Sequence, residues 1–555
     1  MYMLHAFEGN EFTPVTGSGK NTEVLSRSSW NRQRSTNKRL GIWSRVFTRA
    51  GEVRAALERG AEPQEDLQPL VNQLLRMLTG RSGRIFQLAR KHLSLEDLLN
   101  IRRRMIGTGP IGGKSIGMLL GQAILKKADS SWEDFLESHD SFYIGADVFY
   151  TYLVENGLWW IKQKQKDPDA YLDGLELARH QMRSGSFPDY IIEQFADLLE
   201  YFGPSPIVVR SSSLLEDSFD CASAGKAASV FCMNQGSPEQ RMEEFVSAVK
   251  TVYASGMSAD SLRYRSAHGL LGRDEQMSIL VQRVSGMAHG RWFFPHLAGV
   301  GLSFNPYVWS PDIEPEAGVL RLVFGLGTRA VDTSADDFAH VIALNAPERQ
   351  PGTGPEAVRR YSQRKVDALD LESHGHVSRD FMDLAPQCSD LHLDLFASRD
   401  HEVERRAAKS GLKGVFPWFL SFDRLVRETE FFKRIRQMLG ILGDAYGHPV
   451  DVEFSANFRS EKLYRINLLQ YRPMRAKTDA IVSEPPAEIS DEDRIVDSRG
   501  PVVGSSRDVS VDRLIYVVPS EYSELVLNDR SAIAKLIGRF VGAGADDDSR
   551  HTLII

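Results

Sequence analysis

The most chemically suggestive part of the sequence is His448-Pro-Val-Asp-Val-Glu-Phe454, followed after a short polar segment by Leu463-Tyr-Arg-Ile-Asn-Leu-Leu-Gln-Tyr-Arg-Pro473. Polar and apolar residues alternate in both pieces, which is typical of strands with one polar face. The residues between them, at 457–460, favour a turn. We therefore expect the two pieces to pair as a β-hairpin.

Four polar side chains of this hairpin fall on one face of each strand. Residues two apart on a strand point the same way, so Asp451 lies beside Glu453 and Gln470 beside Arg472. Two carboxylates next to an amide and a guanidinium suit Mg²⁺ and a polyphosphate, because carboxylates leave part of the Mg²⁺ shell to phosphate oxygens. An exposed hairpin with alternating polar residues is the alternative interpretation.

A glycine-rich segment, Gly107-Thr-Gly-Pro-Ile-Gly-Gly-Lys-Ser115, leads into a helix predicted at 116–127. Its amides and the amino end of the helix can cradle a phosphate, with Lys114 as a point charge. A Walker A loop, a nucleophile elbow at 113–117 and a purely structural turn are the alternatives. Residue 108 is Thr where a Walker A loop needs glycine, and both catalytic alternatives need a preceding strand where the sequence looks helical.

A second candidate phosphate contact ends the apolar strand predicted at 206–210. The strand delivers Arg210 and the serines 211–213 to one point, and a guanidinium with neutral donors can grip a phosphate. The segment Ser223-Ala-Gly-Lys226 would form a small loop facing it. A strand end followed by a serine-capped helix is the alternative.

The composition is that of a large soluble protein. The chain has 555 residues, of which 42% are hydrophobic and 25% charged, so a mostly disordered or membrane-embedded chain is excluded. A net charge of −7 argues against a dedicated nucleic-acid binder, and three cysteines cannot make a disulfide framework. We find neither a signal peptide nor an apolar stretch long enough to span a membrane, and we expect a cytoplasmic protein.

The basic segment 20–49 is an exception to the acidic balance, with eight Lys and Arg side chains. Such a segment can contact RNA, although its composition favours a solvated arm.

The order of predicted elements favours a mixed class, α/β or α+β. Helices are expected between 51 and 105, with a capped start at Ser94. The other expectations are short helices and loops at 130–200, strands at 275–284, 300–304 and 320–324, a surface excursion at 349–380, and a helix-rich stretch at 397–445.

Taken in order, six short motifs resemble the nucleotide-binding domain of the phosphoenolpyruvate synthase and pyruvate phosphate dikinase family. The resemblance covers about residues 105–476. The motifs are Gly112-Gly-Lys114; Val209-Arg-Ser-Ser212 with Glu216-Asp217 and Ala224-Gly225; Val281-Gln282 followed by Val284; Phe324-Gly-Leu-Gly327; Asp451-Val-Glu453; and Leu469-Gln-Tyr-Arg-Pro473.

The resemblance implies an ATP-grasp fold, in which two α+β subdomains clamp ATP between them. In this family ATP gives its outer phosphates to an enzyme histidine, AMP is released, and the phosphohistidine serves pyruvate. The two subdomains would lie at 105–230 and 231–476. Composition and the order of predicted elements divide the rest into a polar arm with a helical extension at 1–104, a linker at 477–509, and a small βαβ unit at 510–555 whose abrupt end is either a final strand or a truncation.

Carried over by position, the resemblance also implies the site. Lys114 and Arg210 would bind phosphates, and Gln470 and Arg472 would steady the transferring group. Mg²⁺ would be held by Asp451 and Glu453. The remaining contacts with ATP would come from Gly112, Gly113, Ser211, Ser212, Gly225, and the strand 279–284, whose backbone would meet adenine near Gln282 and Val284.

This sequence differs from the family in ways that limit the activity we expect. Thr328 stands where the family has Glu, and Asp332 is a candidate substitute. No histidine follows Thr-Ser or Thr-Cys, and the residues after 476 leave no room for a pyruvate barrel. We therefore expect an ATP- and Mg²⁺-dependent phosphotransferase that passes phosphate to a histidine on a partner protein or to a small molecule. A catalytically silent nucleotide-binding scaffold and an RNA-associated protein using 20–49 are the alternatives.

Overall fold

The computed structural model describes residues 41–60, 67–80, 83–213, 229–267, 269–306, 310, 312–331, 337–349, 355–373, 375–412 and 415–474, the backbone of 5–8 and 11–14, and short pieces between 490 and 554. The chain divides into two compact units, residues 1–474 and 475–555. Among the described residues, no helix has the length and apolar character needed to cross a membrane. The basic residues between 20 and 40 lie outside the described part.

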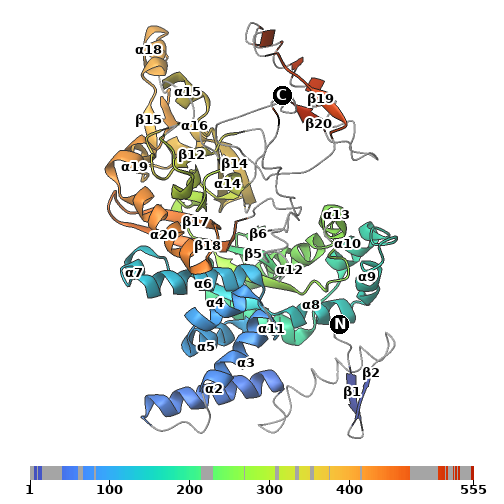
Figure 1. The fold of residues 1–555 in the computed structure, drawn as a ribbon. Helices are drawn as coiled ribbons and strands as arrows, with labels where there is room; N and C mark the ends of the chain where they lie inside the picture. Colours follow the sequence, from blue (N-terminus) through green and yellow to red (C-terminus); the bar gives the residue numbers. More distant parts are fainter. Residues whose placement is uncertain are drawn as a thin grey trace. The chain divides into compact units, whose positions relative to one another are not determined.

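A short hairpin of β1 (His5–Glu8) and β2 (Glu11–Pro14) begins the described part of the first unit, and a group of helices precedes the first large sheet. They are α2 (Ile42–Glu58), α3 (Leu67–Thr79), α4 (Arg84–His92) and α5 (Leu95–Arg103), drawn in blue in Figure 1. Helix α5 begins at the predicted cap: Ser94 Oγ accepts from the Asp97 amide at 3.2 Å, and the Asp97 carboxylate accepts from the Ser94 amide at 2.8 Å. The prediction of a capped start is confirmed.

A five-stranded sheet forms the first half of the main body, with the order β3-β4-β7-β5-β6. Its strands are β3 (Met105–Ile106), β4 (Ser141–Ile144), β5 (Ile207–Ser213), β6 (Ser229–Cys232) and β7 (Met277–Arg283). Strands β5 and β7 confirm the predictions at 206–210 and 275–284. Strand β4 lies in a stretch for which we predicted only short helices and loops, because its four residues are too few to show a period.

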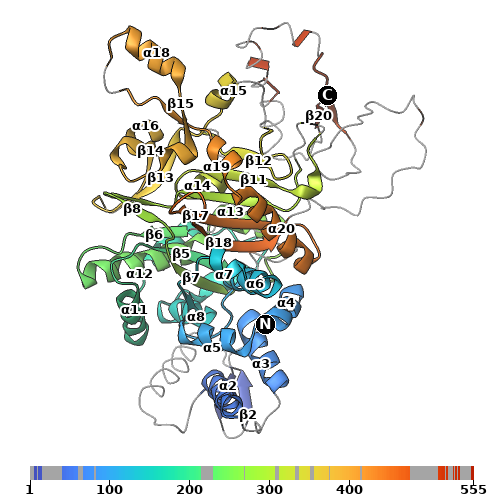
Figure 2. The same cartoon turned by 90° about the vertical axis from the view of Figure 1, so that its left-hand side faces the viewer.

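Two hydrophobic cores lie on the two faces of this sheet. Ile279 and Val281 of β7 belong to one core and Leu280 belongs to the other, as strand alternation requires. Helices α8 (Ala146–Glu155), α10 (Leu175–Ser184), α11 (Asp189–Phe202) and α12 (Pro238–Ser255) pack on the first face, in part visible in Figure 2. Helix α6 (Gly113–Ala128) packs on the second face.

A second five-stranded sheet contains the hairpin predicted at 450–473. Its order is β12-β11-β10-β17-β18, and all neighbours are antiparallel. The strands are β10 (Leu297–Leu302), β11 (Val319–Val323), β12 (His340–Ala343), β17 (Val450–Phe458) and β18 (Tyr464–Pro473). The hairpin and the strands expected near 300–304 and 320–324 are confirmed. Strand β17 runs to Phe458, so the turn is later than predicted.

A four-stranded sheet corrects one expectation. It consists of β8 (Met287–His289), β9 (Trp292–Phe294), β13 (Lys365–Asp370) and β14 (Gly375–Asp380), in the order β14-β13-β9-β8. The prediction of a surface excursion at 349–380 is wrong, because Val366, Ala368 and Leu369 of β13 are fully buried. The sequence did not reveal β13 because its apolar residues are few and are surrounded by glycines, prolines and charged residues, which are typical of surface loops.

The remaining elements of the first unit connect and cover the sheets. They are α7 (Trp132–Phe135), α9 (Trp159–Lys164), α13 (Ala259–Ala267), η1 (Pro315–Ala317), α14 (Thr328–Val331), α15 (Pro355–Arg360), α16 (Phe381–Leu384), η2 (Ala385–Gln387), α17 (Leu393–Phe396), β15 (Ala397–Arg399), α18 (His401–Lys409), β16 (Trp418–Leu420), α19 (Asp423–Glu428) and α20 (Phe431–Tyr446).

In the second unit, β19 (Arg513–Ile515) pairs in parallel with β20 (Thr552–Ile554). Parallel strands need a crossover connection, which agrees with the βαβ order predicted for this unit. The expected helix between these two strands lies largely outside the described residues.

Candidate functional site

The glycine-rich loop is held against the end of β5. Gly112 has φ +84°, and a Cβ at this position would lie 1.4 Å from the carbonyl oxygen of Ser212, so only glycine allows this approach. The Ser115 amide donates to Ser212 Oγ at 3.1 Å, and Lys114 Nζ donates to Ser211 Oγ at 3.3 Å. The structure thus brings Gly112, Gly113 and Lys114 together with both serines, at the amino end of α6.

The start of the loop is fixed separately. Thr108 donates to the carboxylate of Asp147 through its amide, at 2.6 Å, and through its hydroxyl, at 2.7 Å. Helix α5 ends at Arg103, and the two-residue strand β3 then precedes the loop, so the expectation of a helical preceding segment is only partly right. Sequence reasoning missed Asp147, whose position at the start of α8 gave no signal.

Arg210 joins the first sheet to the hairpin of the second. Its Nη2 donates to Glu453 Oε2 at 2.8 Å and to Gln470 Oε1 at 3.3 Å, and its Nη1 donates to the Leu469 carbonyl at 3.2 Å. The residues of this ion pair are each 9% exposed. Burial acts to raise the pKa of Glu453, but the charges of Arg210 and Arg472 hold that pKa below its ordinary value. Glu453 is therefore an anion in a largely enclosed place.

Asp451 pairs with the other arginine of the hairpin. Arg472 donates to Asp451 Oδ2 through Nε at 3.0 Å and through Nη2 at 2.8 Å. Burial raises the pKa of Asp451 despite the attraction of Arg472. The other carboxylate oxygen, Oδ1, is buried and has no hydrogen-bond partner among the described residues. Asp451 thus keeps one acceptor open at the predicted metal position.

These donors fit Mg²⁺ in part. One or two carboxylates plus substrate phosphates are the usual ligands of this ion, and Asp451 Oδ1 is an oxygen without a partner among the described residues. Within the described ranges, no group of three or more His, Cys, Asp and Glu side chains could hold a metal without such help. The protein by itself therefore offers an incomplete shell, to which phosphate oxygens would have to contribute.

Arg321 of β11 belongs to the same surface, and sequence reasoning missed it. Val300 of β10 pairs with both Arg321 and Glu453, so a single row of the sheet runs from Arg321 through Val300 to Glu453 and Gln470. The charge of Arg321 acts on Asp451. The alternation in 319–323 could have indicated an outward arginine but not the neighbour that it faces.

The local charge favours a polyanion. Lys114, Arg210, Arg321 and Arg472 act on the two carboxylates Asp451 and Glu453, so four cations and two anions leave a net charge of +2. Clustered guanidinium and ammonium groups bind phosphate oxygens strongly when they are partly removed from water.

Gln282, where the strand's backbone was expected to meet adenine, is buried. It occupies the central strand β7, where Ser141 of β4 and Val208 of β5 flank it in register, so the sheet uses its backbone. Its Nε2 lies 3.0 Å from Met118 Sδ, and its buried Oε1 has no partner in the described part of the chain. Val284, just past the strand, donates its amide to the Pro206 carbonyl at 2.9 Å. Any contact of Gln282 with a base would therefore come from its side chain.

Three further positions singled out in the sequence are Gly225, Thr328 and Asp332. Gly225 and Asp332 lie outside the described residues. Thr328 donates its hydroxyl to the carboxylate of Asp367 on β13, which also accepts from Arg329 Nε at 2.8 Å. Asp367 thus brings an acidic side chain to the position where the family has Glu, and sequence reasoning missed it because it lies 39 residues away.

The fold is of the mixed α/β class and is consistent with an ATP-grasp-like, nucleotide-binding domain. The model of the family described as "Pyruvate phosphate dikinase, AMP/ATP-binding domain" matches residues 109–493. The match covers more than half of the chain, and the protein belongs to this family. None of the curated proteins matches the chain.

Proposed function

We propose that this protein uses ATP as a phosphoryl donor and passes phosphate to a histidine on a partner protein or to a small-molecule acceptor. The observation that carries the proposal is the joining of Arg210, Glu453 and Gln470 across two sheets, beside the open oxygen of Asp451. Membership of the family supports the ATP-binding part of this proposal.

The glycine-rich loop would bind the phosphates. The amino end of α6 offers backbone amides next to Lys114, which is held near Ser211 by a 3.3 Å hydrogen bond. Gly112 lets this cradle approach β5 closely enough for Arg210 to serve the same phosphate chain. Phosphoryl transfer asks the protein mainly for position and charge neutralisation, which these groups supply.

The two ion pairs would change partners when substrate binds. Arg210 and Arg472 now neutralise Glu453 and Asp451. A bound Mg²⁺ would supply positive charge to the carboxylates and to the phosphate oxygens. Arg210, Arg472 and Gln470 could then direct their donors to the transferring group, without leaving a buried carboxylate uncompensated.

The test is to incubate the protein with Mg-ATP labelled at the β- or γ-phosphate, alone and with lysate from its own source. The expected outcome is release of AMP, with the label found on a protein as acid-labile phosphohistidine. Release of ADP would contradict the family's route, and absence of any ATP consumption in either condition would contradict the phosphotransferase role.

A silent nucleotide-binding module is the second candidate. Thr328 in place of the family's Glu favours it, because its hydroxyl donates to Asp367 and offers no charge of its own. This candidate predicts tight binding of ATP by calorimetry with no AMP or ADP formed under any of the same conditions.

A further inference from the structure

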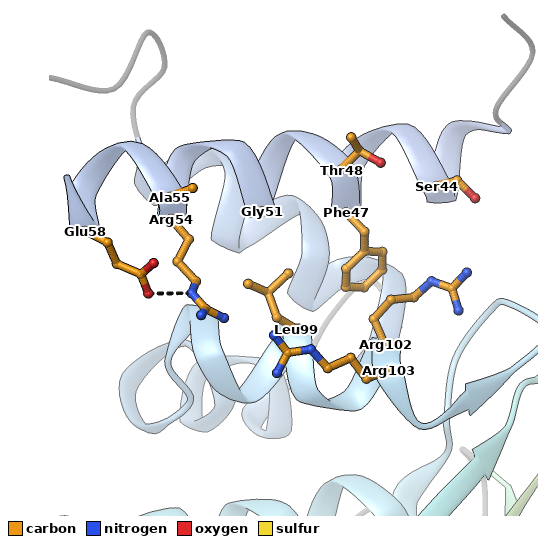
Figure 3. A pocket seen from close by; sticks show the side chains of 10 residues that line it. All are labelled: Ser44, Phe47, Thr48, Gly51, Arg54, Ala55, Glu58, Leu99, Arg102 and Arg103. Carbon is orange, nitrogen blue, oxygen red and sulfur yellow. Dashed lines mark hydrogen bonds and ion pairs between the residues drawn. The ribbon is translucent and has the colours of Figure 1, made fainter. Parts of the chain in front are cut away.

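A hollow lies between α2 and α5, in the part of the chain that precedes residue 109. Figure 3 shows its lining, which comes from one stripe of α2 and from the last two turns of α5. The cavity measures about 420 Å³, which is in the usual range of small-molecule sites. The family match begins at residue 109, so it assigns no role to this place. The lining residues are Ser44, Phe47, Thr48, Gly51, Arg54, Ala55, Glu58, Leu99, Arg102 and Arg103.

The hollow exists because small residues occupy the middle of the α2 stripe. Gly51 and Ala55 lie between the longer side chains of Phe47 and Glu58 at helical spacing. A Cβ at Gly51 would meet no atom within 4 Å, so packing does not require glycine there. Glycine is a poor helix former, second only to proline. Its presence keeps the cavity open at a cost to the helix.

Three guanidinium groups give the hollow its charge. Arg54, Arg102 and Arg103 line it, against the single carboxylate of Glu58. Glu96 lies beside the lining and pairs with both Arg54 and Arg103, which links α2 to α5, and Glu58 pairs with Arg54 as well. A planar guanidinium is well suited to the oxygens of phosphate and carboxylate groups.

The floor of the hollow is apolar. Phe47 is 6% exposed, and Leu99 is partly buried against the same hydrophobic core. In Figure 3 the Phe47 ring lies between Leu99 and the side chain of Arg102. Arg102 also donates to the Met105 carbonyl at 3.4 Å. A ligand that contacts both the arginine side chains and the apolar floor needs an anionic group for the arginines and a compact apolar body for Phe47 and Leu99.

We propose that this hollow is a binding site for a small organic anion, one that joins a phosphate or carboxylate to an apolar or aromatic body. The site is independent of the nucleotide surface, because it shares no residue with it. Phenyl phosphate is the simplest probe of this chemistry, and inorganic phosphate and phenol each carry one half of it.

The test is calorimetric titration of the full-length protein with each probe. Phenyl phosphate is expected to bind with one equivalent and to weaken with added salt, because the attraction between ions is screened. Inorganic phosphate should bind more weakly, and phenol should not bind measurably. Absence of saturable binding of phenyl phosphate would overturn the proposal.

Two variants locate the binding. Gly51→Leu should abolish it by filling the cavity, whereas Gly440→Leu, at a glycine of α20 that also has open space and lines no described cavity, should leave it unchanged. Arg103→Gln should weaken binding at least about tenfold. Its control is Arg406→Gln on α18, whose 70% exposed side chain pairs only with Glu402 on its own helix among the ion pairs of the described residues.

Retention of affinity in Gly51→Leu would place the probe elsewhere and overturn the proposal. A loss of affinity in Arg210→Gln would place the probe at the nucleotide surface and would overturn the proposal as well. Thermal unfolding of each variant checks the fold, and Arg103→Gln decides if Gly51→Leu fails to fold. Because no ATP is used, failure of the proposed phosphotransferase leaves this result unaffected.

Discussion

At the scale of single residues, the buried pair of Arg210 and Glu453 governs the proposed site. Both side chains are 11% exposed, and their atoms approach to 2.8 Å. Removing one member of such a pair leaves an uncompensated charge away from water, so the pair is sensitive to any change of charge. A neutral side chain of the same shape can separate the role of charge from that of contact.

We predict that Glu453→Gln lowers ATP consumption by about 100-fold or more, because it removes one of two carboxylates at the metal position. The amide oxygen can still accept from Arg210, but the buried guanidinium loses its counter-ion, so the loss of unfolding free energy should be up to about 3–5 kcal/mol. Labelled-ATP turnover and urea unfolding measure the two effects.

The matched control is Glu428→Gln on α19, which removes an exposed partner of Arg424. It should change stability by less than about 1 kcal/mol and leave turnover unaltered. Unchanged turnover in Glu453→Gln would show that the metal assignment is wrong.

At the scale of elements, α6 is placed by glycines on its inner side. A Cβ at Gly117 would lie 2.3 Å from the carbonyl oxygen of Tyr471, so the helix rests directly on the backbone of β18. Gly112, at its start, makes the equivalent contact with β5. The helix thus touches both sheets, and its amino end is where they meet at Arg210 and Glu453.

We predict that Gly112→Ala displaces the phosphate loop and weakens ATP binding by at least about tenfold, because the new methyl group would overlap the Ser212 carbonyl. The backbone at Gly112 has φ +84° and ψ 172°, which is a glycine region and costs alanine about 1–3 kcal/mol, and the overlap should cost about 1–3 kcal/mol more. Calorimetric ATP binding and urea unfolding provide the measurements.

Gly157→Ala is the control, since it introduces alanine at another glycine with positive φ, +67°, but with open space around its Cα. It should bind ATP normally. Equal behaviour of the two variants would argue that the contact with β5 does not position the loop.

At the scale of the whole first unit, three histidines of the described residues couple folding to pH: His296 is buried, and His139 and His340 are partly buried. His139 precedes β4, His296 precedes β10, and His340 begins β12, and burial lowers the pKa of each to about 4. His296 Nδ1 accepts from the Phe458 amide at 3.0 Å, which requires the unprotonated nitrogen. In the unfolded chain the pKa of these rings is about 6.5.

We predict that the unit loses stability as the pH falls from about 6.5 to 4. Each ring is neutral in the folded state and takes up a proton on unfolding, so its contribution is complete above its unfolded pKa and is lost below it. The slope is up to about 1.4 kcal/mol per pH unit for each ring. Urea unfolding at several pH values measures it.

His296→Asn should remove one ring's contribution to this slope, because the amide oxygen can accept from the Phe458 amide and does not titrate. His401→Asn, at a ring that is 77% exposed on α18, is the control for the same substitution at the surface. A slope unaffected by His296→Asn would contradict the assignment.

The sequence by itself determined what is local. Strand alternation has a period of two, so the polar face of the hairpin, with Asp451 beside Glu453, followed from spacing alone. The glycine turn before α6, the cap at Ser94 and the strands β5 and β7 were also readable, because neighbouring residues carry those signals. The ordered motifs were enough to indicate the family that the comparison established.

Only the tertiary structure decided which distant residues meet. Arg210 contacts Glu453 across 243 residues, and Arg321 joins their surface because β10 pairs with both β11 and β17. Strand β13 and its contact from Asp367 to Thr328 were likewise invisible in the sequence. Sheet order and helix packing choose such partners through the burial of many side chains at once, and no short stretch of sequence contains that information.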